Sequence, residues 1–250
     1  YNDPSVLHYF FNSDSRIHRS NKPVIIVGNI TLGGTGKTPL IIYLINLLRS
    51  QGFNPGVISR GYLGEFSKKN IPQIILKNHT ARQVGDEPFM IFSKFSNQGF
   101  NLPMAVGVNR VAARDCLIKN FPDVNIILSD DGLSNYALHR DLEIILIDGE
   151  RKFGNGFLIP AGPLREAISR LKKADFLITQ QASQRLSSLP LQDREGEFCY
   201  SMTLEPKNFK PIFSLDLVSP LAREGGLIHA VAGIGNPDRF FKLLESMGFE

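Results

Sequence analysis

The sequence predicts an α/β fold with a mostly parallel sheet and helices on both faces. Short, wholly apolar runs such as Val24–Val27 and Met104–Val106 alternate with segments whose apolar residues recur at helical spacing, such as Pro39–Arg49. Strands that are apolar on both faces are typical of parallel sheets, because the crossover helices cover both sides. The composition, 42% hydrophobic and 21% charged, is that of a soluble globular chain.

The same alternation gives the remaining elements. Further strands are expected at Gly56–Ser59, Ile74–Leu76, Val124–Ser129, Glu143–Asp148 and Phe176–Thr179. Further helices are expected to begin near Asp86 and to span Asn109–Asn120 and Arg165–Lys173.

The alternation breaks at about residue 180, where a polar, turn-rich stretch indicates a linker. Beyond it we expect strands at Phe198–Leu204, Ile212–Val218 and Leu227–Ala232 and a helix at Pro237–Met247. We therefore divide the chain into an N-terminal segment (residues 1–22), a main α/β domain (23–180) and a linker with a smaller, incomplete C-terminal α/β region (181–250). A βα unit with no following strand suggests that further C-terminal sequence is missing.

Charge and composition narrow the function classes. The net charge of +4 fits an anionic ligand or an acidic membrane surface, but the chain has no Lys/Arg run that would favour nucleic acid. The two cysteines and five histidines lack metal-ligand spacing, and no apolar run approaches the ~20 residues that span a bilayer. The first twenty residues combine aromatic and basic side chains, which fits either a helix packed on the domain or a membrane-interface segment.

A glycine-rich segment between the first strand and the first helix predicts a phosphate-binding loop. Its glycines permit backbone N–H groups to point at phosphate oxygens, while Lys37 supplies a cation and Thr38 a hydroxyl for Mg²⁺. Thr31 departs from the strict pattern, and Leu32 replaces the lysine that defines the dimeric septum-site and partitioning ATPases. The expected fold is therefore P-loop NTPase-like. The predicted nucleotide-binding residues are Thr31, Leu32, Gly33, Gly34, Thr35, Gly36, Lys37 and Thr38.

Two acidic pairs are candidates for the chemistry. Asp130 and Asp131 follow an apolar strand, where a carboxylate can bind the metal of a phosphate loop, although Asp-Asp-Gly also suits a simple turn. Asp86 and Glu87 open a predicted helix, so Asp86 is either a helix N-cap or a general base for a hydroxyl nucleophile. Sequence spacing leaves both alternatives for the second pair open.

Several segments together resemble one family, tetraacyldisaccharide 4′-kinase. They are VIIVGNITLGGTGKTPL, GVISRGY, VGDEP, NRVAARD, SDDGL and GNGFLIPAGPLRE, and the similarity resumes at HAVAGIGNPDRFFKLLESMGFE. The resemblance implies ATP-dependent phosphorylation of the 4′-hydroxyl of an acylated glucosamine disaccharide 1-phosphate, giving lipid IVA. It also implies peripheral attachment to the cytoplasmic face of the bacterial inner membrane, with the N-terminal segment as a membrane contact.

The resemblance also assigns roles to residues. Lys37 would hold the β- and γ-phosphates, Asp86 would be the base for the sugar hydroxyl, and Glu87 lies beside it. Asp130 and Asp131 match Walker-B-like acids, and Glu166 matches a further site acid. The expected catalytic residues are Asp86, Lys37, Glu87 and Asp131, and the expected Mg²⁺ ligands are Thr38, Asp130 and Glu166.

The chain departs from the family pattern in two respects. Ser134 and Asn135 replace a Gln-His pair, and the family continues beyond residue 250 into a segment with a histidine thought to partner the base. Two other functions therefore stay open: another P-loop small-molecule kinase or ATPase, or an inactive, truncated nucleotide- or membrane-binding relative.

Overall fold

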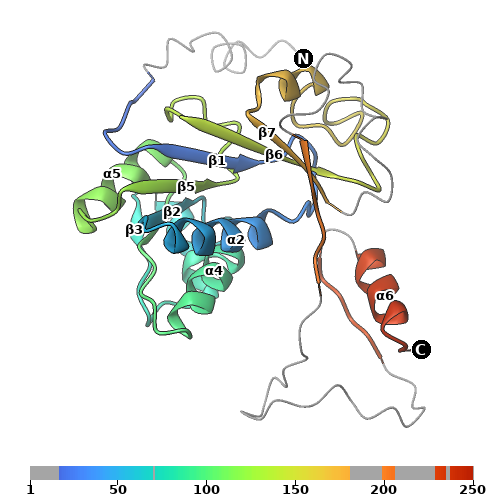
Figure 1. Ribbon diagram of the computed structural model, residues 1–250, viewed down its shortest axis with the longest axis horizontal. Coiled ribbons are helices and arrows are strands. Elements are labelled where there is room, and N and C mark those ends of the chain that lie inside the picture. The colour runs from blue at the N-terminus through green and yellow to red at the C-terminus, as the bar shows by residue number, and fades with distance from the viewer. Residues whose placement is uncertain (1–16, 70, 181–198, 206–228, 235–236, 250) are drawn as a thin grey trace.

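The computed structural model describes residues 17–69, 71–180, 199–205, 229–234 and 237–249. Over these residues the chain forms one eight-stranded sheet with the order β3-β4-β2-β5-β1-β6-β7-β8 (Figure 1). Every neighbouring pair is parallel except β3 and β4. The strands β1 to β8 are Val24–Gly28, Pro55–Ser59, Gln73–Ile74, Met104–Val106, Ile126–Asp130, Leu142–Asp148, Phe176–Gln180 and Cys199–Met202.

Four described α-helices and two 3-10 helices connect or precede these strands, and a fifth α-helix lies near the C-terminus. The α-helices are α2 (Lys37–Ser50), α3 (Ala81–Val84), α4 (Asp86–Ser96), α5 (Arg110–Asn120) and α6 (Pro237–Ser246). The 3-10 helices are η1 (Glu65–Lys69) and η2 (Ile168–Lys173).

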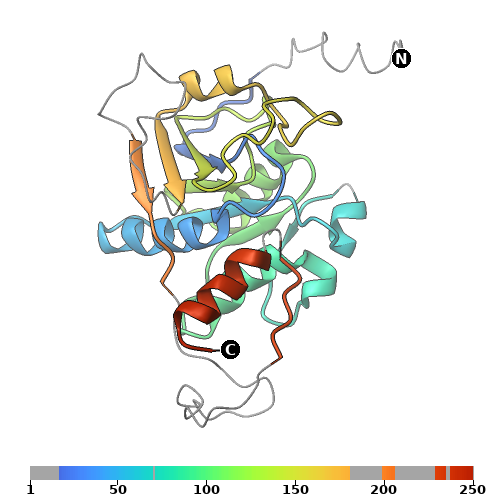
Figure 2. The same cartoon turned by 90° about the vertical axis from the view of Figure 1, so that its right-hand side faces the viewer.

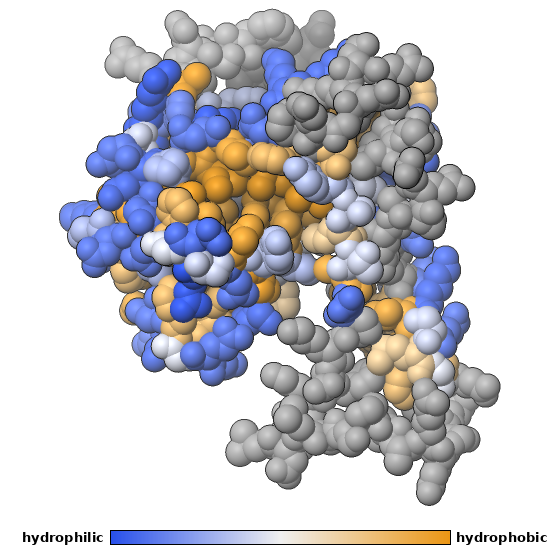
Figure 3. Space-filling view, in the orientation of Figure 1, coloured by the Kyte–Doolittle hydropathy of each residue, from blue (hydrophilic) through white to orange (hydrophobic). Residues whose placement is uncertain are grey.

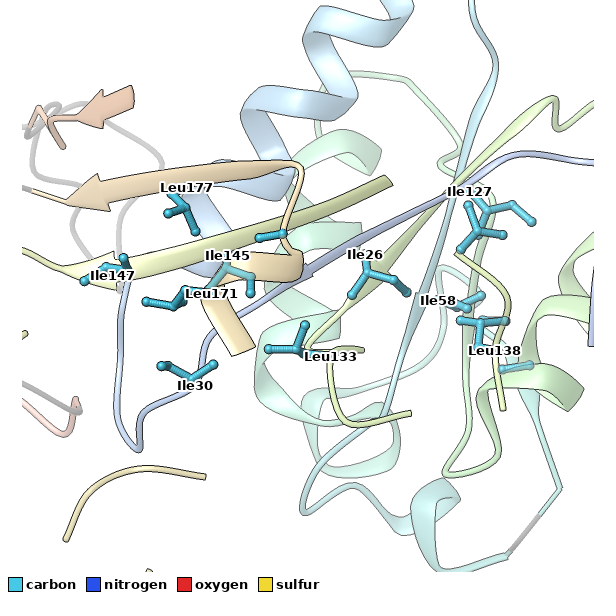
Figure 4. Packing of buried hydrophobic residues seen from close by; sticks show 14 of the residues in the cluster. Ile26, Ile30, Ile58, Ile127, Leu133, Leu138, Ile145, Ile147, Leu171 and Leu177 are labelled. Carbon is cyan, nitrogen blue, oxygen red and sulfur yellow. The ribbon is translucent and has the colours of Figure 1, made fainter. Parts of the chain in front are cut away.

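Alternate strand positions face opposite sides of the sheet and build two apolar layers. On one side Ile26 and Ile145 pack with η2 through Leu171 (Figure 4). The same cluster includes Leu117 of α5. On the other side the neighbouring positions, such as Val27, pack with α2 and α4. Each fully buried aliphatic side chain of this kind contributes about 1.5–3 kcal/mol. The prediction of a mostly parallel α/β sheet with helices on both faces is confirmed.

The sheet continues beyond the predicted domain boundary at residue 180. β8 follows the linker and pairs in parallel with β7, with Leu177 opposite Cys199 and Gln180 opposite Met202. By contrast, α6 is set apart from the sheet in Figure 1. On the face shown in Figure 3, apolar residues gather over the central strands and hydrophilic residues surround them.

Three predicted elements differ from the structure. The helix expected at Arg165–Lys173 is a 3-10 helix that begins only at Ile168, because the backbone N–H of Arg165 donates to Ile30 O (2.7 Å) and keeps that part extended. The strand expected at Ile74–Leu76 lies at Gln73–Ile74, and residues 229–232 of the strand expected at Leu227–Ala232 are not in a strand. The strand expected at Ile212–Val218 and most of the N-terminal segment lie outside the described residues.

Candidate active site

The phosphate loop leaves the centre of the sheet and enters α2. β1 lies between β5 and β6, so the loop emerges where the ends of three parallel strands meet. Gly36 has φ 87°, and a Cβ there would lie 2.9 Å from Cε of Met202. Only glycine satisfies both conditions without strain, since other L-residues avoid this region of φ. α2 then begins at Lys37 and presents its unpaired N-terminal N–H groups, a ready site for an anion.

A cleft of about 700 Å³ lies over this loop. Its walls include the beginning of α4, so the phosphate loop and the Asp86-Glu87 pair share one cavity. Asp86 is the first residue of α4 and Gly85 is the N-cap, so the alternative reading of Asp86 as an N-cap is wrong. The lining residues on which the site depends are Leu32 to Thr38, Asp86, Glu87, Asp131, Arg165 and Gln180.

The Lys37 ammonium group is held at the base of the cleft by two oxygen atoms. Nζ donates to Oδ1 of Asn29 (3.1 Å) and lies 3.8 Å from Oδ1 of Asp131. The side chain is only 11% exposed, so these contacts are weakly screened by solvent. Asn29 itself is buried and fixed by a hydrogen bond from its Nδ2 to Thr31 O (2.8 Å).

Arg165 ties the two acceptors of Lys37 together. Its guanidinium donates to both carboxylate oxygens of Asp131, at 3.0 and 2.9 Å, and to the backbone and side-chain oxygens of Asn29. Burial alone would raise the pKa of Asp131, but the Arg165 hydrogen bonds and the Lys37 charge hold this pKa below its ordinary value. Asp131 is therefore an anion across the neutral pH range.

Asp130, one residue earlier, has the opposite character. It is 1% exposed at the end of β5; Oδ2 accepts from Ser59 Oγ (3.0 Å), while Oδ1 has no hydrogen-bond partner among the described residues. Burial, and then the negative charge of Glu87, raise the pKa of Asp130 to about 6. A buried carboxylate oxygen without a donor is uncommon, and it is the type of atom that a cation would bind.

The buried side chain of Arg110 is hydrogen-bonded to this end of β5. Its guanidinium donates to Gly107 O (2.6 Å) and to the backbone oxygen of Asp130 (3.3 Å). Burial lowers the pKa of Arg110 to about 10, against the opposing effect of Asp130 and Asp131, so it stays charged at neutral pH. A fixed positive charge thus lies close to the acidic pair.

Glu166 does not line the cleft. Its Oε2 accepts from the Tyr136 hydroxyl (2.8 Å) and pairs with Nε of Arg170 (3.2 Å). Within the described part of the chain, no cluster of three or more His, Cys, Asp or Glu side chains could hold a metal ion. The structure thus brings Thr38 to the cleft lining, whereas Asp130 is buried beside Asp131 and does not line the cleft. A metal-ligand role for Glu166 would require it to leave both partners.

A loop at residues 157–164, called the hairpin below although its Leu158–Leu164 bridge is parallel, is hydrogen-bonded to the phosphate loop. Leu164 bridges Thr31 in antiparallel fashion, and the N–H of Leu32 donates to Pro163 O (2.8 Å). The N–H of Leu32 is therefore committed to the protein, and Thr31 lies outside the cleft lining. Arg165 follows the hairpin directly, which explains how it reaches Asp131.

Sequence reasoning missed four side chains of this site: Asn29, Ser59, Arg110 and Arg165. Asn29 and Arg165 stand inside the conspicuous segments GNITLGGTGKTP and GNGFLIPAGPLRE, so attention to the polar residues flanking the loop could have found them. Ser59 and Arg110 are recognisable only once β2, β4 and β5 are known to be neighbours.

Comparison with known proteins identifies the family of the chain. The chain is 45% identical over 227 residues to the tetraacyldisaccharide 4'-kinase of Shewanella sediminis (strain HAW-EB3), covering 91% of this chain and 61% of that protein. It is 48% identical over 227 residues to the same kinase of Shewanella pealeana (strain ATCC 700345 / ANG-SQ1), covering 91% of this chain and 63% of the relative. The chain thus spans about three fifths of the length of these relatives.

The fold also matches a solved structure, the "apo" form of LpxK from Aquifex aeolicus crystallised in complex with ATP. The TM-score is 0.69 at 23% identity, over 98% of this chain and 75% of that one. The family LpxK, tetraacyldisaccharide-1-P 4'-kinase, matches residues 8–250. The chain therefore belongs to the tetraacyldisaccharide-1-P 4'-kinase family.

Proposed function

We propose that this protein transfers the γ-phosphate of ATP to the 4′-hydroxyl of a tetraacylated glucosamine disaccharide 1-phosphate, forming lipid IVA. The observation that carries the proposal is the shared cleft, which joins a phosphate loop to the Asp86-Glu87 pair on the facing helix. The identity of the acceptor is taken from the relatives, which are named tetraacyldisaccharide 4'-kinases.

In this proposal the phosphates of ATP bind the loop from Gly33 to Thr38. The N-terminal N–H groups of α2 and the Lys37 ammonium attract the β- and γ-phosphates, whose charge they neutralise. Phosphate oxygens of bound ATP would be further acceptors for Lys37, beside Asn29 and Asp131. Gly36 permits this close approach because it has no side chain.

Mg²⁺ fits two of its three expected ligands. The unpartnered Oδ1 of Asp130 and the hydroxyl of Thr38 are oxygen donors of the kind that this ion prefers. When bound, Mg²⁺ would neutralise charge that develops on the transferring phosphoryl group. Asp131, held by Arg165, keeps Lys37 aligned on the phosphates, and a cation bound at Asp130 would lower the pKa of that carboxyl group.

Asp86 acts on the acceptor. It is the first residue of α4 and lines the cleft that it shares with the phosphate loop, and we assign it to accept the proton of the sugar hydroxyl. Phosphoryl transfer passes through a loose transition state, so the hydroxyl must be positioned more than it must be ionised. Glu87 also lines the cleft, and its charge raises the pKa of Asp130.

The proposed working location is the cytoplasmic face of the bacterial inner membrane, with residues 1–22 as a peripheral contact and residues 23–180 as the kinase unit. The described part of the chain has no helix of the length and hydropathy that a membrane span needs. The substrate is an anionic lipid, which suits the basic charge balance of +4.

The decisive experiment is incubation with labelled ATP and detergent-dispersed tetraacyldisaccharide 1-phosphate. We expect label in the lipid, and none with Lys37→Ala, for which Lys119→Ala, an exposed lysine of α5 outside the cleft lining, is a matched control. Label that survives in the Lys37→Ala protein would disprove the site. ATP hydrolysis without lipid labelling would favour another P-loop ATPase, and neither activity with retained ATP binding would favour an inactive binding relative.

A further inference from the structure

The 157–164 hairpin presents an unusual run of exposed apolar side chains. Phe157, Leu158 and Ile159 are 62%, 50% and 48% exposed, and Pro160 and Ala161 after them are exposed as well. In Figures 1 and 2 the yellow loop after β6 projects from the body of the molecule. A contiguous apolar patch of this kind in water is unfavourable and commonly marks a surface that binds something.

The hairpin backbone is fixed, so these side chains cannot fold inward. The N–H of Ile159 donates to Leu164 O (2.8 Å), and the N–H of Leu164 donates to Phe157 O (3.1 Å). Across the tip, the Asn155 side chain donates to Ala161 O (2.9 Å). Turning the apolar residues toward the core would break these bonds, so their exposure is a built feature of the fold.

The charges around the hairpin indicate the kind of partner. Residues 151–165, RKFGNGFLIPAGPLR, contain no Asp or Glu, although Glu150 and Glu166 adjoin them. Of their three basic residues, Arg165 is bound to Asp131 and belongs to the cleft. Arg151 and Lys152, just before the tip, are both exposed, and Arg151 is also paired with Asp148 (3.0 Å). An apolar tip flanked by cations matches a bilayer interface, where apolar side chains reach the acyl boundary and cations meet anionic headgroups.

We propose that the hairpin is a lipid-contacting element that inserts Phe157, Leu158 and Ile159 into the interface of an anionic membrane. The inference rests on the proposed function, whose substrate is a lipid, and adds the surface by which the cleft meets the bilayer. Because the hairpin is bonded to Leu32 and Thr31, its insertion would bring the phosphate loop to the membrane surface. A second copy of the chain is a poorer occupant, since a symmetric contact would place the basic flanks against each other.

The absence of tryptophan from the chain makes the test direct. Phe157→Trp gives a single fluorophore at the tip, and Tyr43→Trp, at a position of similar exposure (60%) on α2, is the matched control. Vesicles of phosphatidylethanolamine with phosphatidylglycerol should shift the emission of the tip variant to shorter wavelength and leave the control unchanged. Phosphatidylcholine vesicles should give a smaller shift, since they lack the anionic headgroup.

A second pair of variants measures the contribution to binding. Phe157→Ser combined with Ile159→Ser should reduce sedimentation with the anionic vesicles several-fold, while Tyr43→Ser should not. Kinase activity on detergent-dispersed substrate tests the proposed function separately, so it can succeed while the hairpin proposal fails. An unshifted tip fluorophore in the presence of vesicles, or a shift that depends only on protein concentration, would overturn the proposal.

Discussion

Replacement of Asp130 by Asn tests the electrostatic description of the site most sharply. The carboxyl group has a pKa of about 6 in the folded chain against 3.8 for an ordinary Asp, because burial disfavours its charge. At about 1.4 kcal/mol per pKa unit, ionising this group in the fold costs roughly 3 kcal/mol. Asn keeps the shape and still accepts the Ser59 hydrogen bond, so Asp130→Asn should stabilise the nucleotide-free protein at neutral pH.

The pH dependence follows from the sign of the shift. A carboxyl whose folded pKa is raised contributes stability that is complete below 3.8 and is lost as pH rises through about 6. Between pH 5 and pH 7 the native protein should lose about 1.4 kcal/mol relative to Asp130→Asn, or roughly 3–6 °C in Tm. Above pH 7 the difference should stay constant.

The assay is thermal unfolding of both proteins across this pH range, repeated with MgATP. Other carboxylates titrate in both proteins, so the difference between the curves isolates Asp130. With MgATP the order should reverse, because the native carboxylate binds the cation and Asn does not. Curves that run parallel from pH 5 to pH 7 would refute the reasoning, since they would mean that Asp130 is not desolvated.

Three further substitutions probe the loop and its partners. Arg165→Lys keeps the charge but loses the two-pronged contact with Asp131; steady-state kinetics should show a kcat reduced roughly tenfold, and an unchanged kcat would remove Arg165 from the mechanism. Gly36→Ala should destabilise the fold by about 1–2 kcal/mol and abolish ATP binding, as measured by denaturation and nucleotide titration, whereas Gly52→Ala, at a similar φ in open space, should affect only stability. Asp86→Asn should lower lipid phosphorylation by about 10²- to 10⁴-fold with ATP affinity retained, and lost ATP binding would instead place Asp86 at the nucleotide.

The parts of the fold that the sequence predicted well are those with strong local patterns. β1, α2 and the β4–α5–β5 segment combine apolar runs with clear helix ends, and the structure has each of them close to the predicted bounds. The Asn109 side chain, for example, accepts a hydrogen bond from the N–H of Ala112 at the beginning of α5. Local propensity and tertiary packing agree in these segments.

The segment between Gly149 and Lys173 was predicted less well because its structure depends on contacts distant in sequence. Arg165 lies in a segment with helical spacing, yet its backbone and side chain are both bound to residues near Asn29. A charged side chain such as that of Arg165 could pair with any of several acidic residues, and sequence spacing does not show which one it contacts. Glu166 shows the same effect, since its position next to Arg165 did not reveal that it contacts Tyr136 and Arg170.

The cross-links between the phosphate loop and the 157–164 hairpin bear on how the site opens. The backbone N–H groups of Leu32 and Arg165 donate hydrogen bonds between the two segments. The phosphate loop follows β1 and the hairpin follows β6, and these two strands are neighbours in the centre of the sheet. These amide protons should therefore exchange with solvent at rates set by opening of the central sheet and not by fluctuation of a surface loop. The phosphate loop would then unfold only together with the core of the sheet, in a single cooperative transition of the whole domain.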